Sequence, residues 1–145
     1  MGKARTTPAT QAADRAGAAY RLHEYDPEAA AGPTYGEAAA AALGMAPQRV
    51  FKTLVTQVDG KALVLAVVPV AGELDPKALA EKATGSVVGG ISPLGSRRAL
   101  PVVLDASAME HETIVVNGGR RGLQMELAPA DLVRVCAATV ARVAR

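Results

Sequence analysis

The stretch VFKTLVTQVDGKALVLAVVPV, residues 50–70, predicts the centre of the fold. It holds two apolar runs rich in β-branched residues, with Asp59 and Gly60 between them. An Asp-Gly pair between two such runs is typical of the tight turn of a β-hairpin. We therefore predict two antiparallel strands, 50–58 and 61–70.

A lysine stands in the middle of the first of these strands. Side chains alternate between the two faces of a strand, so every second residue should share a face with Lys52. These residues are Val50, Leu54, Thr56 and Val58. An edge strand whose lysine reaches water is one explanation for a charge on this mostly apolar face. A cleft that needs a fixed positive charge is the other.

Helix start and stop signals mark three stretches before residue 85. Thr7 can cap a first helix that ends at Gly17. Thr34 can begin a second helix that Gly44 stops. In the third stretch, LDPKALAEKA, Asp75 is a suitable cap, and the proline after it suits the first helical position.

Alternation and turn residues predict further strands. Residues 18–26 should form a strand in which His23 and Tyr25 lie on the same face. Residues 99–107 should form another strand, which a short helical turn follows. Residues 113–127 read as a second hairpin with a glycine-rich tip. The closing stretch APADLVRVCAATVARVAR predicts one helix to the last residue.

Composition and element order together predict the fold class. The chain has 145 residues, of which 50% are hydrophobic and 21% charged, as in globular proteins with a real core. Strands and helices do not alternate regularly. We therefore predict one α+β domain, 1–145, with a mixed, mostly antiparallel sheet and packed helices. No apolar run reaches the length of a membrane span, so we expect neither a transmembrane segment nor a membrane as partner.

Charge and cysteine content limit the function. The net charge of +2 permits nucleic-acid binding, and the aromatic content of 3% disfavours a base-stacking platform. The single cysteine, Cys136, excludes a disulfide within the chain and fits the reducing cytoplasm, where we expect the protein. Cys136 should pack as a small apolar residue, because no histidine lies in a recognisable partner motif.

Metal and cofactor motifs are not present in the sequence. His23 and His111 are the only histidines, and neither has an HxxxH or CxxC companion, so we expect no zinc site. Neither GxGxxG nor the ending of a phosphate-binding P-loop occurs, so we expect no cofactor.

Two glycine-rich stretches are candidate binding loops. They are TGSVVGGISPLG, residues 84–95, and NGGRRG, residues 117–122. Glycine lets a backbone approach a ligand and orient its N–H groups toward it, but both stretches could also be plain loops. Arginine pairs follow the first loop at 97–98 and lie within the second at 120–121. Arginine forks suit phosphate oxygens, but arginine pairs at turns are usually just solvated, which is the interpretation that we favour.

Three motifs in a fixed order give the chain a family resemblance. They are FKTLV at 51–55, TGSVVGGISPLG at 84–95 and NGGRRGLQMEL at 117–127, and VVPVAGELD at 67–75 supports them. With these motifs the chain resembles the YbaK/EbsC family of free-standing aminoacyl-tRNA deacylases, relatives of the editing domain inserted in bacterial prolyl-tRNA synthetases. The resemblance covers nearly the whole chain and is closest to the Cys-tRNA(Pro) deacylase branch.

The resemblance implies which residues form the site. The catalytic residues that it implies are Lys52, Gly89 and Gly90. The substrate-binding residues that it implies are Tyr25, Ser92, Pro93, Asn117, Gly118 and Gly119. Asn117 stands where the family commonly has serine, and its amide can still donate and accept hydrogen bonds.

The resemblance also implies a reaction and its partners. The expected activity is trans-editing, in which cysteine is removed from tRNA(Pro), and also from tRNA(Cys), after attack by the substrate's own thiol. The expected partners are the aminoacylated tRNA and prolyl-tRNA synthetase, and a homo-oligomer stays open. Two alternatives remain: a deacylase for another mischarged tRNA, such as Ala-tRNA(Pro), with water as nucleophile, or a non-catalytic tRNA- or synthetase-binding module.

The chain departs from the family between residues 75 and 84. The family usually has a helix, a short strand and the start of another helix there, whereas only PKALAEKA bridges the gap here. This shortening puts one edge of the sheet, and one wall of the pocket, in question.

Overall fold

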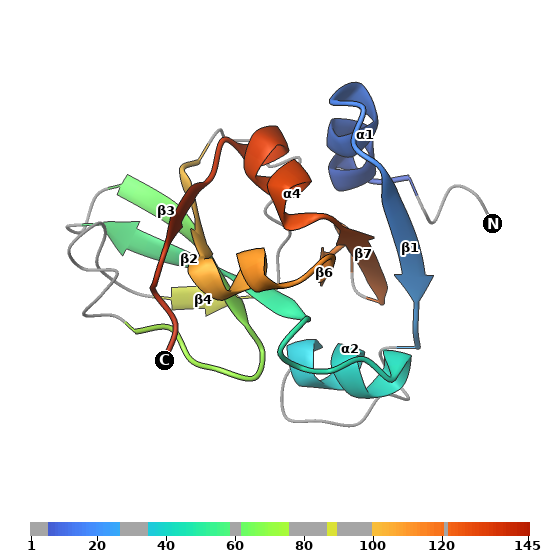
Figure 1. The fold of residues 1–145 in the computed structure, drawn as a ribbon, viewed down its shortest axis with the longest axis horizontal. Helices are drawn as coiled ribbons and strands as arrows, with labels where there is room; N and C mark the ends of the chain where they lie inside the picture. Colours follow the sequence, from blue (N-terminus) through green and yellow to red (C-terminus); the bar gives the residue numbers. More distant parts are fainter. Residues whose placement is uncertain (1–5, 27–34, 59–61, 76–86, 90–99, 121) are drawn as a thin grey trace.

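A computed structural model describes residues 6–26, 35–58, 62–75, 87–89, 100–120 and 122–145 (Figure 1). The elements of the first half are α1 Pro8–Arg15, β1 Tyr20–Glu24, α2 Tyr35–Leu43, β2 Phe51–Val58 and β3 Ala62–Pro69. Those of the second half are β4 Val87–Gly89, β5 Val102–Asp105, the 3-10 helix η2 Ala106–Glu110, β6 Ile114–Asn117, β7 Leu123–Leu127, α4 Pro129–Cys136 and β8 Thr139–Ala141. No helix in the described ranges is long and apolar enough to cross a membrane.

The strands form two sheets. One has the order β4-β2-β3-β5-β8 and the other the order β1-β7-β6. All pairs are antiparallel except β3 with β5 and β5 with β8. The predicted mixed, mostly antiparallel α+β fold is therefore confirmed, with the strands divided between two sheets.

Both predicted hairpins are present. β2 pairs with β3 from Phe51 opposite Pro69 to Val58 opposite Ala62, and the Asp59–Gly60 turn lies outside the described residues. β6 pairs with β7 in the second hairpin. The cap at Thr7 is also confirmed, because its hydroxyl accepts a hydrogen bond from the N–H of Thr10.

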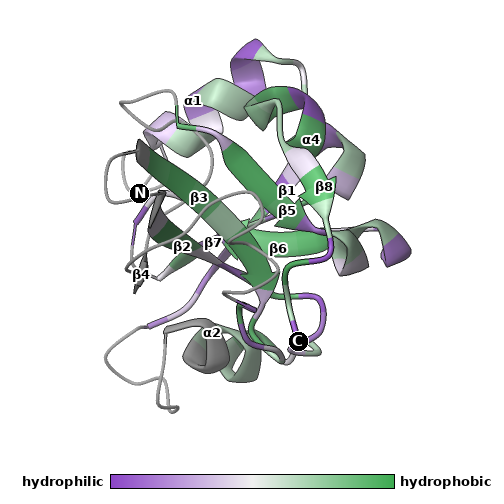
Figure 2. Cartoon of the chain, turned by 90° about the vertical axis from the view of Figure 1, so that its left-hand side faces the viewer, coloured by the Kyte–Doolittle hydropathy of each residue, from purple (hydrophilic) through white to green (hydrophobic). Residues whose placement is uncertain are grey.

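The main core lies between the two sheets. Large side chains from both sheets meet there, among them Leu65, Val67, Leu104, Ile114, Met125 and Leu127. Figure 2 shows hydrophobic residues along β3, β5 and β6. Burying each such side chain stabilises the fold by about 1.5–3 kcal/mol. In both views α1 and α4 lie at one end of the molecule and α2 at the other.

The sequence predicted one helix for the closing segment, and this prediction is wrong. α4 ends at Cys136, Ala137 takes a left-handed conformation with φ 50°, and β8 then pairs in parallel with β5. The buried carboxylate of Asp105 accepts hydrogen bonds of 2.8 Å from the N–H groups of Val143 and Ala144. These contacts hold the residues after β8 extended beside residues 73–75, where Leu74 and Ala144 form a bridge. Together they outweigh the helical pattern of this segment.

The glycine-rich stretch also differs from the predicted loop. Val87, Val88 and Gly89 form β4, which pairs with β2 opposite Thr56, Val55 and Leu54. Two β-branched residues beside an open strand edge favour this pairing. The helix predicted after Asp75, and the shortened segment between residues 75 and 84, lie outside the described residues.

Candidate functional site

Lys52 lies on a strand with neighbours on both sides. β2 pairs with β3 along its length and with β4 at Leu54–Thr56, so it is not the edge strand of the simpler explanation. The half-buried side chain of Lys52 stands opposite Val68, on the face that Leu54 and buried Val68 share. Within the described part of the chain its ammonium group has no hydrogen bond or ion pair.

Thr53, next along β2, is also unpartnered. Its hydroxyl is buried and has no hydrogen-bond partner among the described residues. Buried polar groups are nearly always hydrogen-bonded in structural positions. By alternation Thr53 lies on the opposite face of β2, toward the main core, so Lys52 alone marks its own face as a place where a polar ligand can be bound.

Strand register places Lys52 in a row of polar side chains. β2 approaches β6 in parallel at a bridge between Val50 and Val115. Two residues further along each strand, alternation brings Lys52 and Asn117 to the same side. Asn117 pairs with Gln124 on β7, and Gln124 pairs with His23 on β1. The polar row is thus Lys52, Asn117, Gln124 and His23.

The sequence analysis assigned neither His23 nor Gln124 to the site. The more deeply buried of the two is Gln124. Its side chain is only 5% exposed, and no hydrogen bond joins its amide to another described residue. A signal was present in the motif, because Leu123 and Met125 on either side of it point into the core. Alternation alone puts the polar Gln124 on the opposite face, in the middle of the row.

Tyr25 stands beside the polar row. It follows β1 directly, and its backbone N–H donates a 2.9 Å hydrogen bond to the carbonyl of Gly122. By alternation its side chain shares the face of His23, as the sequence predicted. The structure therefore brings Tyr25, Asn117 and Lys52 to one region, although 92 positions separate the first two of them in the sequence.

The β6–β7 turn is closed by its own side chain. The Oδ1 atom of Asn117 accepts a 2.7 Å hydrogen bond from the N–H of Gly119, and Nδ2 donates to the carbonyl of Arg120 at 3.2 Å. Both ends of the Asn117 amide are thus used within the turn. This arrangement fixes the backbone that carries the two candidate glycines.

Packing requires both of these glycines. A Cβ on Gly118 would lie 2.9 Å from Cγ of Leu123. Gly119 has φ +109°, and a Cβ there would lie 2.8 Å from Thr7, whose hydroxyl donates to the carbonyl of Gly118. The close approach of Leu123 therefore explains Gly118, and the close approach of Thr7 explains Gly119, whether or not a ligand also contacts the turn.

Gly89 is the described end of the first glycine loop. It pairs opposite Leu54, so it lies on the strand beside β2, close in register to Lys52. The other predicted residues of this loop lie outside the described residues, namely Gly90, Ser92 and Pro93.

A polar network adjoins the row. Glu126 accepts a 2.8 Å contact from His23 on Oε1, and on Oε2 it binds the Thr113 hydroxyl at 2.6 Å and the Arg49 guanidinium at 3.0 Å. Hydrogen bonds from Thr113 and His23, together with Arg49, lower the pKa of the Glu126 carboxyl to about 2, although partial burial opposes this. Glu126 is therefore an ionised structural acceptor at neutral pH.

Cys136 lies apart from this region and is poorly suited to act as a nucleophile. Burial raises the pKa of its thiol to about 11, and the side chain packs against the main core from α4. A thiol is a nucleophile only when ionised. Among the described residues no three histidine, cysteine, aspartate or glutamate side chains gather to hold a metal ion.

Comparison with known proteins identifies the family of this chain. Two stretches, residues 29–83 and 80–135, match the family described as aminoacyl-tRNA editing domain. The Enterococcus faecalis protein that carries the name Cys-tRNA(Pro)/Cys-tRNA(Cys) deacylase EbsC is 37% identical over 113 residues, which are 67% of this chain and 69% of that protein. This chain belongs to the YbaK/EbsC family of aminoacyl-tRNA editing domains.

Solved structures agree with this editing-domain assignment at the level of the fold. The crystal structure of hypothetical protein APE2540 matches with a TM-score of 0.80 at 21% identity, covering 95% of this chain and 99% of its own. A structure described as a trans-editing enzyme for prolyl tRNA synthetase matches with a TM-score of 0.79 at 19% identity, covering 95% of each chain. The family resemblance read from the three sequence motifs is thereby confirmed.

Proposed function

We propose that this editing-domain protein is a trans-editing aminoacyl-tRNA deacylase that removes cysteine from tRNA(Pro) and from tRNA(Cys). The observation that carries the proposal is a half-buried lysine without a partner in the described chain, set in a polar row of a protein from this family. The name of the relative EbsC supports the choice of cysteine as the amino acid.

Lys52 is the group that we assign to the reacting ester. Its positive charge would stabilise the carbonyl oxygen of the ester as that oxygen becomes negative. Backbone N–H groups of Gly89 and Gly90 would share this task. A lysine that already had a carboxylate partner would offer far less charge to a substrate, so the absence of such a partner among the described residues supports this role.

The remaining residues would shape the pocket around the amino acid and the terminal ribose. Tyr25 would donate a hydrogen bond to the substrate, and Ser92 and Pro93 would form one wall. Because the amide of Asn117 closes its own turn, we assign Asn117, Gly118 and Gly119 the task of holding that turn in shape. Gln124 joins them as a buried amide in the same row.

The reaction needs no nucleophile from the protein. The cysteine thiol of the substrate would lose its proton and attack its own carbonyl carbon, forming a carbon–sulfur bond. The ester carbon–oxygen bond would break, the ribose oxygen would take up the proton, and cysteine would leave as a cyclic thiolactone. A free thiol has a pKa of about 8.5, so part of it is ionised near neutral pH. The raised pKa of Cys136 makes the protein's own thiol a poor alternative.

Selection of the correct tRNA would depend on prolyl-tRNA synthetase as a partner. A net charge of +2 gives little general attraction for a phosphate backbone. We therefore expect the isolated chain to bind tRNA weakly and with little preference among tRNAs. The synthetase would deliver the mischarged tRNA(Pro).

A comparison of three substrates tests the reaction. The substrates are cysteinyl-tRNA(Pro), alanyl-tRNA(Pro) and 2-aminobutyryl-tRNA(Pro), the last of which has a side chain of similar size to cysteine but without a thiol. Thiol attack predicts rapid loss of cysteine, release of a thiolactone and little loss of the other two amino acids. Rapid loss of alanine or 2-aminobutyrate would show that water is the nucleophile. Stability of all three esters would overturn the enzymatic function.

A further inference from the structure

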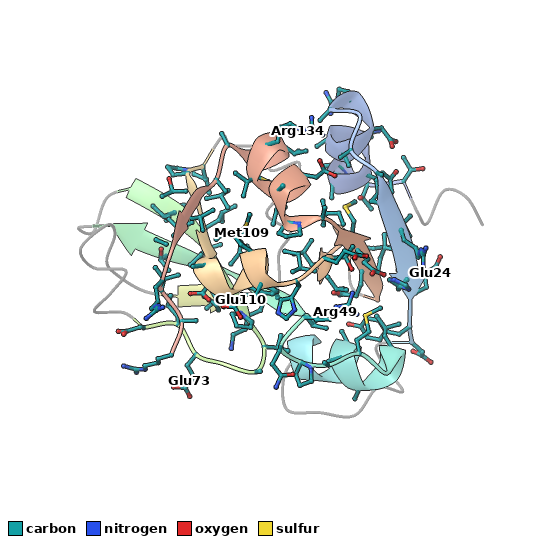
Figure 3. All side chains as sticks on the ribbon, viewed as in Figure 1. Glu24, Arg49, Glu73, Met109, Glu110 and Arg134 are labelled. Carbon is teal, nitrogen blue, oxygen red and sulfur yellow. The ribbon has the colours of Figure 1, made fainter. Side chains whose placement is uncertain are left out.

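The polar network around Glu126 includes Arg49, which lies just before β2 in the chain. Arg49 lies two residues before β2 and is fixed to the three-stranded sheet by both its backbone and its side chain (Figure 3). Its carbonyl accepts a 2.9 Å hydrogen bond from the N–H of Val115. Its guanidinium donates to the carbonyl of Thr113 at 3.2 Å, to the Thr113 hydroxyl at 2.6 Å and to Glu126 at 3.0 Å.

Arg49 therefore lies where the chain passes from one sheet to the other. Val50 still contacts β6 of the three-stranded sheet through its bridge to Val115, and Phe51 begins β2 of the five-stranded sheet. Lys52 follows one residue later. The hydrogen bonds that hold Arg49 therefore also set the direction in which β2 leaves the three-stranded sheet. Lys52 lies on β2, so they set its place as well.

Glu126 connects Arg49, where the chain passes between the two sheets, to the polar row. One carboxylate oxygen binds Arg49 and Thr113, and the other binds His23, the last member of the row. The Glu126 side chain is 16% exposed and that of His23 22%, so water competes weakly for these contacts. A single carboxylate thus sets the distance between the strand of Lys52 and the far end of the row.

We propose that Arg49 and Glu126 are positioning residues, whose ion pair sets where the Lys52 ammonium lies relative to the rest of the polar row. This proposal rests on the proposed function in one respect, since it takes Lys52 to be the group that acts on the ester. Neither residue is among those that we assign to the ester. Groups that must stay within a fraction of an ångström of their productive place need such supporting contacts.

The kinetic test compares two backgrounds. Glu126→Gln keeps the shape of the side chain and removes its charge, and Arg49→Lys keeps the charge and removes the planar fork. In the wild-type background each should lower the single-turnover rate of cysteinyl-tRNA(Pro) deacylation by about 10- to 100-fold, the scale for a small misplacement of a catalytic group. The substrate concentration at half-maximal rate should stay within about twofold, because binding of the tRNA body is unaffected.

In the Lys52→Ala background the same two substitutions should have no further effect, because the group that they position is gone. An equal loss of rate in both backgrounds would show that the ion pair acts without Lys52, and no loss in either would show that it does not act on the reaction; both results overturn the proposal. Glu73→Gln is the matched control, since its exposed carboxylate lies 4.0 Å from Arg145 at the C-terminal end of the molecule (Figure 3).

A second measurement does not depend on activity. The chain has five lysines, so their ¹³C-methylated amines give few NMR signals, and Lys52→Arg identifies the signal of Lys52. Glu126→Gln and Arg49→Lys should move this signal, and Glu73→Gln should not. An unmoved Lys52 signal in folded variants would overturn the proposal. If the wild type deacylates no substrate, the proposed function fails, and this NMR comparison still decides the positioning role.

Discussion

The hydroxyl of Thr7, the cap of α1, donates a 2.6 Å hydrogen bond to the carbonyl of Gly118 in the β6–β7 turn. The same oxygen accepts a hydrogen bond from the N–H of Thr10. One buried hydroxyl therefore caps the first helix and joins it to the turn beside the polar row, across 111 positions of sequence.

Thr7→Val should test this link, because valine keeps the shape and removes the oxygen. The helix loses its cap, and the carbonyl of Gly118 loses a buried donor. We expect the free energy of unfolding to fall by about 1–3 kcal/mol, measured by urea denaturation. Thr6→Val is the control, since Thr6 is exposed and lies before the cap. Equal stability of the two variants would contradict a structural role for this hydroxyl.

Gly119→Ala should be more harmful than Gly17→Ala, although both glycines have positive φ. Gly17 has φ +69° and nothing within 4 Å of an added Cβ, so alanine there costs only backbone strain, about 1 kcal/mol. Gly119 has φ +109°, and its added Cβ would also meet Thr7 at 2.8 Å. Thermal melts of the two variants give the comparison. A smaller loss for Gly119→Ala would mean that α1 does not pack on this turn as described.

Asp105→Asn should loosen the C-terminal strand. The carboxylate accepts from the N–H groups of Ser107, Val143 and Ala144, and an amide in its place turns one acceptor into a donor. We expect a loss of about 1–3 kcal/mol in the free energy of unfolding. Amide hydrogen exchange should rise most at Val143 and Ala144. Glu110→Gln, at an exposed position, is the control, and unchanged exchange at both amides would contradict this account.

Much of the fold was predictable because its signals are local. The β2–β3 hairpin, the Thr7 cap and the alternation around His23 each depend on residues within a few positions. The strand β8 was not predictable in this way. Its segment has a helical pattern, and what decides against a helix is Asp105, which lies 38 positions before Val143.

The candidate site was likewise predictable only where its signals are local. Family motifs pointed to Tyr25, Lys52 and Asn117, but no local pattern could place them on one face. That required the Val50–Val115 bridge and the β1–β7–β6 register. The contact between His23 and Glu126, 103 positions apart, has no sequence signal at all. Gln124 is the exception, since alternation around it was visible in the motif.

The stability contributed by Glu126 should depend on pH. Folding lowers the pKa of its carboxyl from 4.5 to about 2, so its contribution is present above about pH 4.5 and is lost as the pH falls toward 2. The wild type should exceed Glu126→Gln in free energy of unfolding by on the order of 2–3 kcal/mol near neutral pH. This difference should shrink at about pH 3. Urea denaturation at several pH values measures it, and a difference that grows as the pH falls would contradict the ion-pair network.

The last prediction concerns Lys52, whose half-buried side chain lies on the same face as Leu54 and Val68 and has no partner in the described chain. Lys52→Ala should leave the free energy of unfolding within about 1 kcal/mol of the wild type, or raise it, because a charge on an apolar face costs desolvation. Deacylation of cysteinyl-tRNA(Pro) should fall by on the order of a hundredfold, the scale for one preorganised electrostatic group. Lys52→Arg should restore only part of it, since the guanidinium is larger and differs in geometry. Arg142→Ala, which removes an exposed positive charge, controls for a general loss of attraction to tRNA. Wild-type turnover by folded Lys52→Ala protein would refute the assignment of this lysine to the reaction.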